Sequence, residues 1–176
     1  LICYDPEKTL RKYTDNEDDI KQILDKFYKS ELYRDTDRGV KTHAEVIDII
    51  STEISVSAVK LLKKLYVEEN YGRTNMPAAQ GMYELISELN SNGYGTYLLS
   101  NAGYDFYDYS KYIPAISILK GGVVSCDIHI LKPERGIYLS LLDKYSLKAD
   151  ECLFIDDLEE NAEGARRCGM DAICYS

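Results

Sequence analysis

The 176-residue sequence predicts an α/β fold: a parallel β-sheet with helices on its faces, joined to a small bundle of helices. Two patterns indicate this. From Pro6 to about Tyr66 apolar residues recur at helical spacing and strand-like runs are rare, whereas the rest of the chain alternates helix-like and strand-like segments. Such alternation is typical of parallel sheets, in which a helix connects successive strands. We therefore expect a helical unit at residues 6–76 and an α/β unit formed by residues 1–5 and 77–176.

Polar residues mark where the helices of the bundle begin. Asp5 before Pro6 predicts an N-cap followed by proline at the first helical position. Thr14–Glu17 and Thr42–Glu45 each fit a capping box, in which the Thr and Glu side chains bond each other's backbone amides. Polar breaks are expected at residues 35–39 and at residues 68–76. The apolar stripes that these helices would bury contain Ile20, Ile23, Leu24, Phe27, Val46, Ile49, Ile50, Val56, Val59, Leu62 and Leu65.

The most informative segment is the apolar run Cys152–Ile155, which is followed by Asp156 and Asp157. The run predicts a buried parallel strand that places two neighbouring carboxylates at its carboxyl end. Such a pair fits a site for Mg²⁺, which prefers hard oxygen ligands, but it also fits a solvated loop or a helix N-cap. The strands expected in this part of the chain are residues 95–99, 123–126, 152–155 and 172–175.

Two other strand ends carry complementary groups. Ser100 and Asn101 follow one strand, and Lys132 comes after the segment Val123–Cys126. Pro133 fits the first position of the next helix, so Lys132 would lie beside a helix N-terminus, where an anion is favoured. Taken singly, a Ser-Asn pair is mostly turn chemistry and a Lys-Pro pair is common. Because parallel strands end in one crevice, these groups and the acidic pair together predict a site for a phosphate and a metal.

The order of these segments resembles motifs two, three and four of the haloacid dehalogenase (HAD) superfamily of hydrolases. The resemblance is closest to the branch with a helical cap inserted after the first strand, which includes sugar-phosphate phosphatases. It implies a Rossmann-like core with an inserted cap. The segments that carry it are Leu98–Asn101, Lys132–Tyr138, Phe154–Asn161, Gly164–Ala165 and Gly169–Met170.

The resemblance also implies roles for six residues and a Mg²⁺ cofactor. Ser100 would hydrogen-bond a phosphoryl oxygen, and Asn101 would hold the loop or contact the same group. Lys132 would neutralise charge on the nucleophile and on the phosphoryl group. Asp157 would bind Mg²⁺ directly, Asp156 would bind it directly or through water, and Asn161 would orient that carboxylate. The family's first motif is a strand that ends in an aspartate nucleophile, and this sequence contains no match to it. By the register of the other motifs, the nucleophile would lie roughly five residues before Leu1. Asp5 is better explained as the N-cap described above.

The expected activity is therefore Mg²⁺-dependent hydrolysis of a small phosphorylated metabolite through an aspartyl-phosphate, by a longer enzyme whose first strand precedes Leu1. A haloacid dehalogenase, a phosphotransferase or mutase, and a non-catalytic HAD-like binding module are the alternatives. The acidic pair argues against a dehalogenase, because in those enzymes small polar residues take its place.

The amino-acid composition limits the classes of binding partner and the cellular compartment that we expect. Thirty acidic residues against 21 basic residues give a net charge of -9, which argues against general binding to nucleic acid or to an anionic membrane. No apolar run approaches the ~18–20 residues of a membrane span. The five cysteines are scattered and the histidines number two, so zinc is disfavoured and a reduced, cytoplasmic chain is expected. The patterns point to no particular oligomeric state.

Overall fold

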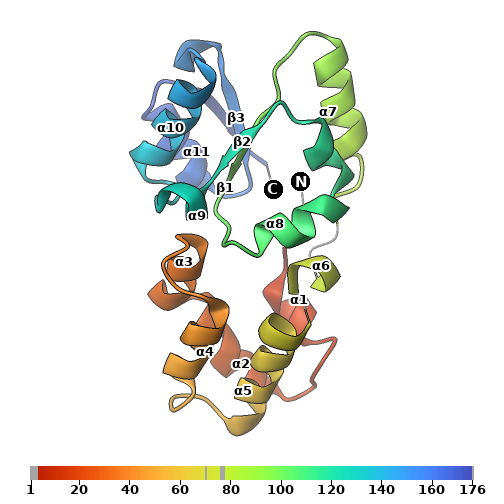
Figure 1. Ribbon diagram of the computed structural model, residues 1–176, viewed down its shortest axis with the longest axis vertical. Coiled ribbons are helices and arrows are strands. Elements are labelled where there is room, and N and C mark those ends of the chain that lie inside the picture. The colour runs from red at the N-terminus through yellow and green to blue at the C-terminus, as the bar shows by residue number, and fades with distance from the viewer. Residues whose placement is uncertain (1–3, 70, 76–77, 176) are drawn as a thin grey trace.

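The computed structural model describes residues 4–69, 71–75 and 78–175. Its two parts are a group of helices and an α/β part (Figure 1). The group of helices contains α1 (Pro6–Leu10), α2 (Glu17–Ile23), η1 (Leu24–Tyr28), α3 (Glu31–Asp37), α4 (His43–Ile50), α5 (Val56–Lys63), η2 (Lys64–Glu68) and α6 (Tyr71–Asn75). The α/β part contains α7 (Met82–Ser91), β1 (Leu98–Ser100), α8 (Phe106–Tyr109), η3 (Ser110–Tyr112), η4 (Pro114–Ile118), β2 (Gly122–Val124), α9 (Ser125–Ile128), α10 (Arg135–Tyr145), η5 (Ala149–Glu151), β3 (Leu153–Asp156), α11 (Glu159–Arg166) and β4 (Asp171–Cys174).

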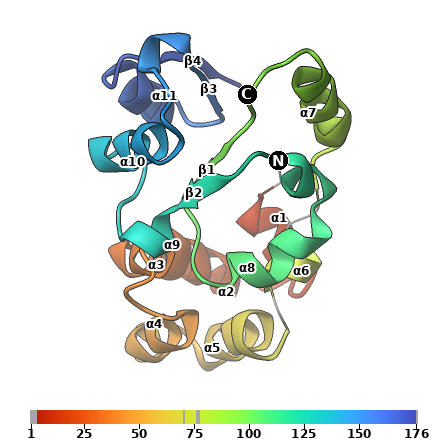
Figure 2. The same ribbon diagram turned by 45° about the horizontal axis from the view of Figure 1, so that its top comes forward.

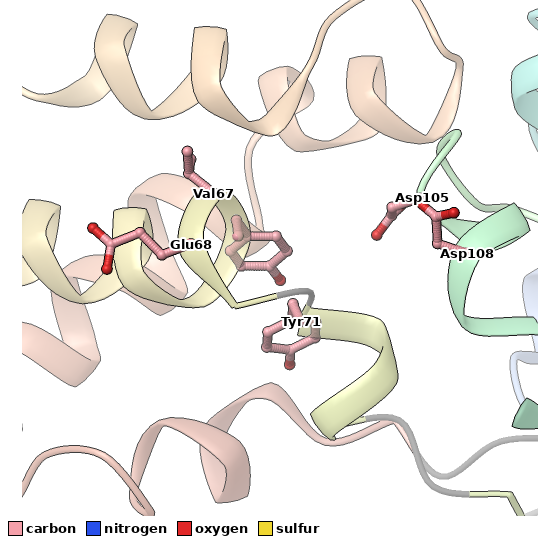
Figure 3. Close-up of a pocket in the computed structure, with 6 residues that line it drawn as sticks. Val67, Glu68, Tyr71, Asp105 and Asp108 are labelled. Atoms are coloured by element: carbon pink, nitrogen blue, oxygen red, sulfur yellow. The ribbon is translucent and has the colours of Figure 1, made fainter.

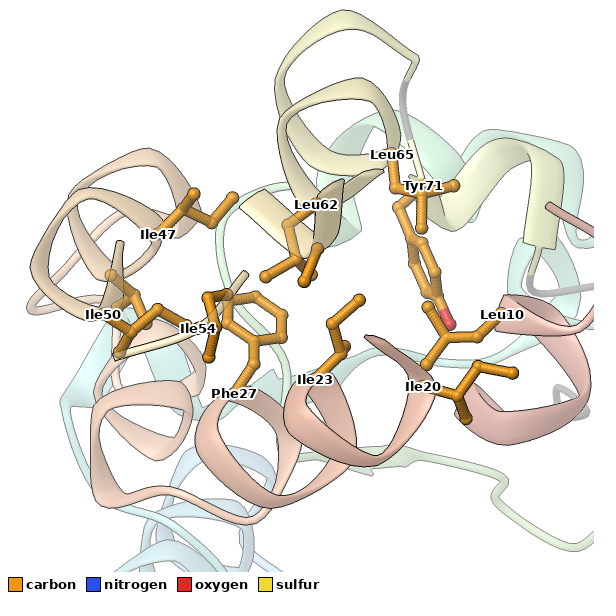
Figure 4. Packing of buried hydrophobic residues seen from close by; sticks show 12 residues of the cluster. Leu10, Ile20, Ile23, Phe27, Ile47, Ile50, Ile54, Leu62, Leu65 and Tyr71 are labelled. Carbon is orange, nitrogen blue, oxygen red and sulfur yellow. The ribbon is translucent and has the colours of Figure 1, made fainter. Parts of the chain in front are cut away.

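The group of helices has a hydrophobic core of its own (Figure 4). Phe27 lies within it, with Ile23, Leu62 and Leu65, and all four side chains are fully buried. Most of the apolar residues that the helical spacing selected lie in or against this cluster, but Ile49 and Val56 are exposed. The cluster joins residues from Leu10 to Tyr71, as expected for one small bundle. The exact boundaries at residues 6 and 76 stay a prediction.

The local signals for helix starts were right in two places and wrong in a third. Asp5 caps α1 with Pro6 in its first turn, and Thr42 forms the complete capping box with Glu45. The predicted box at Thr14 is wrong, because the cap of α2 is Asn16, whose side chain accepts the backbone N–H groups of two residues in the first turn. Asn16 is nearer to the start of the apolar stripe and uses the same chemistry.

Two predicted breaks contain helix. Residues 35–37 continue α3, because Ser30 caps that helix and the chain leaves it only after Asp37. The polar segment 68–76, expected as a linker, includes the short helix α6. Polar composition alone therefore misplaced these boundaries.

The strands pair in parallel, as predicted. Leu98–Ser100 of β1 lies opposite Gly122–Val124 of β2, and Leu153–Asp156 of β3 lies opposite Asp171–Cys174 of β4. Within the described residues these are two separate two-stranded ladders (Figure 2), so each keeps unpaired edges.

Strand β3 is less buried than its apolar sequence predicted. Phe154 packs into the core with helix α10, but the side chains on the opposite face are exposed, by 56% for Leu153 and 55% for Ile155. Ile173 of β4 is 49% exposed on that same face. The expectation of a buried strand is therefore wrong for this face of β3 in the described part of the chain.

Three further boundaries differ from expectation. The strand expected over 95–99 is β1, which runs from Leu98 to Ser100. The strand expected over 123–126 ends at Val124, and Ser125 begins the short helix α9. Helix α10 begins at Arg135, with Glu134 as its N-cap, so Pro133 lies before the helix and not at its first position. No helix in the described ranges has both the length and the apolar composition to cross a membrane.

Candidate active site

A buried ion pair joins two of the predicted site residues. The Lys132 ammonium lies 2.6 Å from the Asp156 carboxylate, and the two side chains are only 10% and 6% exposed. Asp156 is the last residue of β3, and Lys132 precedes helix α10, so the pair joins two connections of the α/β part. Burying two charges is costly unless they are paired, which explains why this contact is short and direct.

Two further donors stabilise the charged form of Asp156. The backbone N–H of Leu158 and the side-chain amide of Asn161 both donate to its Oδ1, at 3.0 and 2.8 Å. Burial raises the pKa of Asp156, but the charge and hydrogen bond of Lys132, with these two donors, outweigh burial and hold the pKa below its usual value. Asp156 is therefore a fixed anion at neutral pH.

Asn101 fixes the position of Lys132 through its main chain. The Asn101 amide donates to the Lys132 carbonyl at 3.0 Å, and its Oδ1 accepts the Lys132 backbone N–H at 2.8 Å. These two bonds connect the segment after β1 to the segment before α10. Of the two possibilities that the sequence left open for Asn101, the geometry favours holding the loop.

The remaining two predicted residues lie next to this network. Ser100 is the half-buried last residue of β1 and precedes Asn101. Asp157 follows Asp156, is exposed, and its carboxylate forms no hydrogen bond or ion pair among the described residues. Hydrogen bonds thus bring together Asn101, Lys132 and Asp156, with Asn161 on the far side of Asp156. Ser100 and Asp157 are placed only as their sequence neighbours.

The donor set suits Mg²⁺ rather than a transition metal. The described residues contain no group of three or more His, Cys, Asp or Glu side chains that could hold an ion. Mg²⁺ needs fewer protein ligands, since one or two carboxylates with waters and substrate phosphate are its usual environment. Asp157, whose carboxylate is exposed, and Asp156 beside it fit that requirement. The side-chain oxygen of Asn161 is buried there and has no hydrogen-bond partner in the described part of the chain.

Sequence reasoning missed a residue that joins the two parts of the molecule. The hydroxyl of Ser125 accepts the Ala102 backbone N–H at 2.9 Å and donates to the carbonyl of Asp37 at 2.6 Å. Nearby, a side chain at Gly103 would come within 2.8 Å of the Thr36 carbonyl oxygen. The end of α3 therefore packs closely against the segments that follow β1 and β2. The signal was present, because Ser125 follows the apolar pair Val123 and Val124 just as Ser100 follows Leu98 and Leu99.

The chain matches one family model over most of its length. The model of haloacid dehalogenase-like hydrolases covers residues 10–169. Among curated proteins, bifunctional epoxide hydrolase 2 of Mus musculus is 41% identical over 51 residues, which is 29% of this chain and 9% of that protein. The matched region is thus less than a tenth of that relative's length.

Solved structures share the fold over nearly the whole chain. A predicted HAD-like family hydrolase from Porphyromonas gingivalis has a TM-score of 0.73 at 22% identity, over 100% of this chain and 86% of its own. A HAD family enzyme from Bacteroides thetaiotaomicron, in complex with magnesium and inorganic phosphate, has a TM-score of 0.72 at 19% identity, over 100% and 89%. A dehalogenase has a TM-score of 0.72 at 17% identity, over 97% and 79%. The α/β core with its helical cap is therefore a HAD fold, and the chain belongs to the haloacid dehalogenase-like hydrolases.

Proposed function

We propose that the protein is a Mg²⁺-dependent phosphomonoester hydrolase that acts on a small phosphorylated metabolite. The observation that carries this proposal is the acidic pair at the end of β3. Asp156 is a buried anion paired with Lys132, and Asp157 beside it is exposed and has no partner among the described residues. One carboxylate is thus fixed by protein donors while its neighbour is available to a cation.

The residues divide the work of phosphoryl transfer, which asks mainly for positioning and for stabilisation of negative charge. Lys132, held by Asn101, neutralises charge on the phosphoryl group and on the nucleophile. Ser100 donates its hydroxyl to a phosphoryl oxygen. Asp157 would hold Mg²⁺ with Asp156 as the second carboxylate, and Asn161 would orient Asp156. When bound, Mg²⁺ supplies positive charge to the phosphoryl oxygens.

The nucleophile in this proposal is an aspartate in a strand that precedes residue 1. Attack of its carboxylate on phosphorus breaks the P–O ester bond, releases the alcohol part of the substrate and gives an aspartyl-phosphate. Water then hydrolyses this intermediate to inorganic phosphate and the free carboxylate. Among the described residues the two ladders keep unpaired edges, which supports this part of the proposal because a further parallel strand needs such an edge to pair with. The helices α1–α6 (residues 6–76 in the expected division) act as the cap that covers the crevice and limits access of water. The four described cysteines are all free, which suits a reducing compartment such as the cytoplasm.

Asp157 provides the test. We expect the complete chain to hydrolyse p-nitrophenyl phosphate only with Mg²⁺, and Asp157→Ala to lose most of this activity. The matched control is Asp150→Ala, which removes a carboxylate from η5, outside the proposed site. Hydrolysis that persists in EDTA and in Asp157→Ala would contradict the metal role. Release of halide from 2-chloropropionate without metal would instead identify a dehalogenase. Transfer of the phosphoryl group to an added alcohol would identify a phosphotransferase.

A further inference from the structure

Asp37 ends α3 where the cap meets the strand ends, and among the described residues its carboxylate has no hydrogen-bond or ion-pair partner. Its main-chain carbonyl is held by Ser125, which fixes the end of α3 there. Within the part of the chain that the structure covers, its side chain accepts no hydrogen bond and forms no ion pair. An acid in such a position is stabilised by whatever positive group can reach it.

The charges around Asp37 come from both parts of the molecule. Burial, followed by repulsion from Asp105, raises the pKa of Asp37 to about 7, although Arg34 and Lys132 act in the opposite direction. Lys132 is already paired with Asp156, and Arg34 forms an ion pair with Glu31. Among the described residues, neither Lys132 nor Arg34 therefore forms an ion pair with Asp37.

On the core side, Asp105 also lines a cavity. This cavity of about 300 Å³ has Asp105 and Asp108 on the side of the α/β part and residues of η2 and α6 on the side of the cap (Figure 3). Its cap wall includes the rings of Tyr66 and Tyr71, which stack with centroids 4.4 Å apart. Carboxylates combined with tyrosine ring faces favour a cation over an anion.

We infer that Asp37 is a specificity-determining residue that selects phosphate esters whose alcohol part carries a protonated amine. This inference rests on the proposed phosphatase function. The phosphoryl group would lie at Lys132, and the ammonium would lie between Asp37 and Asp105. There it gives Asp37 a charge-assisted hydrogen bond and relieves its repulsion from Asp105. A substrate with a second anionic group would meet two carboxylates instead, so it is disfavoured.

A transition-metal ion is a poorer occupant of this position. The described residues bring no third carboxylate, histidine or cysteine to the pair Asp37 and Asp105. A neutral polyol could hydrogen-bond both carboxylates, but it would leave their repulsion in place. The amine and the polyol differ in charge, so matched substrates separate them.

The experiment compares aminoalkyl phosphates of two, four and six carbons with hydroxyalkyl phosphates of the same lengths, using the complete chain with Mg²⁺. We expect kcat/KM to favour the amine at least ~10-fold at the best length, which corresponds to ~1.4 kcal/mol. In the isosteric variant Asp37→Asn this ratio should fall to near one. Asp48→Asn is the matched control, because its carboxylate pairs with Lys63 within the cap, and it should keep the wild-type ratio.

Equal rates for amine and hydroxyl substrates in the wild type, or a preference that persists in Asp37→Asn, would overturn the inference. If the wild type hydrolyses none of these esters and no aryl phosphate, the proposed function fails by itself. Binding of the same esters, measured by titration calorimetry, then decides the inference separately. Tighter binding of the amine that depends on Asp37 supports it, and equal binding overturns it.

Discussion

Removing the Lys132 ammonium tests whether the buried ion pair stabilises the fold. At a separation of 2.6 Å and an effective dielectric constant of 20, the attraction between Lys132 and Asp156 is about 6 kcal/mol before desolvation is counted. In Lys132→Met, Asp156 would keep two donors, from Leu158 and Asn161, but lose its only counter-charge among the described residues. Breaking a buried pair typically costs about 3–5 kcal/mol. Because the two donors remain, we expect a loss of about 3 kcal/mol.

The assay is urea unfolding of the complete chain at pH 7, followed by the same measurement at lower pH. The control is Lys148→Met, since Lys148 and Glu151 form an ion pair of nearly the same length, 2.7 Å, but with side chains 72% and 65% exposed. That variant should change the free energy of unfolding by less than about 0.5 kcal/mol. The Asp156 charge adds stability above its unfolded pKa, near 4, and this is lost as pH falls through its lower folded pKa. The effect of Lys132→Met should therefore shrink toward pH 3.

A loss below about 1 kcal/mol, a loss equal to that of Lys148→Met, or an effect that does not change with pH would show that the buried ion pair does not stabilise the fold. A second variant removes the remaining ambiguity. Adding Asp156→Asn to Lys132→Met removes the uncompensated charge, so the double variant should recover part of the lost stability. If it is less stable than Lys132→Met by the full cost of Asp156→Asn alone, the two residues do not interact.

Three further predictions concern the cap and its contact with the core. Thr42→Ala removes the capping box with Glu45 and should lower the free energy of unfolding by about 1 kcal/mol in urea titration; an unchanged midpoint would contradict this. Gly72→Ala places a methyl carbon 2.0 Å from the Tyr109 ring, so thermal unfolding should show a loss of about 1–3 kcal/mol that Tyr109→Leu partly restores. Asp37→Asn should be more stable than the wild type at pH 8, by at most ~4 kcal/mol, and equal at pH 4. The sign follows because Asp37 ionises at about pH 7 when folded and near pH 4 when unfolded, so the folded chain carries the cost of the charge only at high pH. A variant that is no more stable at pH 8 refutes this assignment.

The features that the sequence predicted are those set by neighbouring residues or by sheet geometry. The capping box at Thr42 needs only a Thr and a Glu three residues apart. Lys132 and Asp156 could be placed together because the sequence predicted one parallel sheet, and the ends of parallel strands and the segments that follow them lie on the same side. Their direct contact across 24 residues is the consequence.

The features that the sequence did not predict depend on packing between distant segments. Asp37 looked like part of a polar break, and only its contact with Ser125, 88 residues away, places it against the strand ends. The exposure of one face of β3 could not be predicted either, because an apolar strand has the same sequence pattern whether one face or both faces are covered. The position of a short apolar strand in a sheet depends on which strands pair with it and which helices pack on it.

This difference explains why the residues proposed to bind the phosphoryl group can be predicted from the sequence, whereas the residue proposed to select the alcohol part of the substrate cannot. The groups proposed to hold the phosphoryl group come from the α/β core, where strand order alone brings them together. The group proposed to select the substrate comes from the cap, and its position depends on how α3 packs against α9. Because the Ser125 hydroxyl bonds both Ala102 and Asp37, a shift of α3 also acts on the loop that follows Ser100. Selection by the cap and positioning of the phosphoryl group are thereby coupled through one side chain. Substitution of Ser125 should accordingly disturb both, whereas substitution of Asp37 should change selection alone.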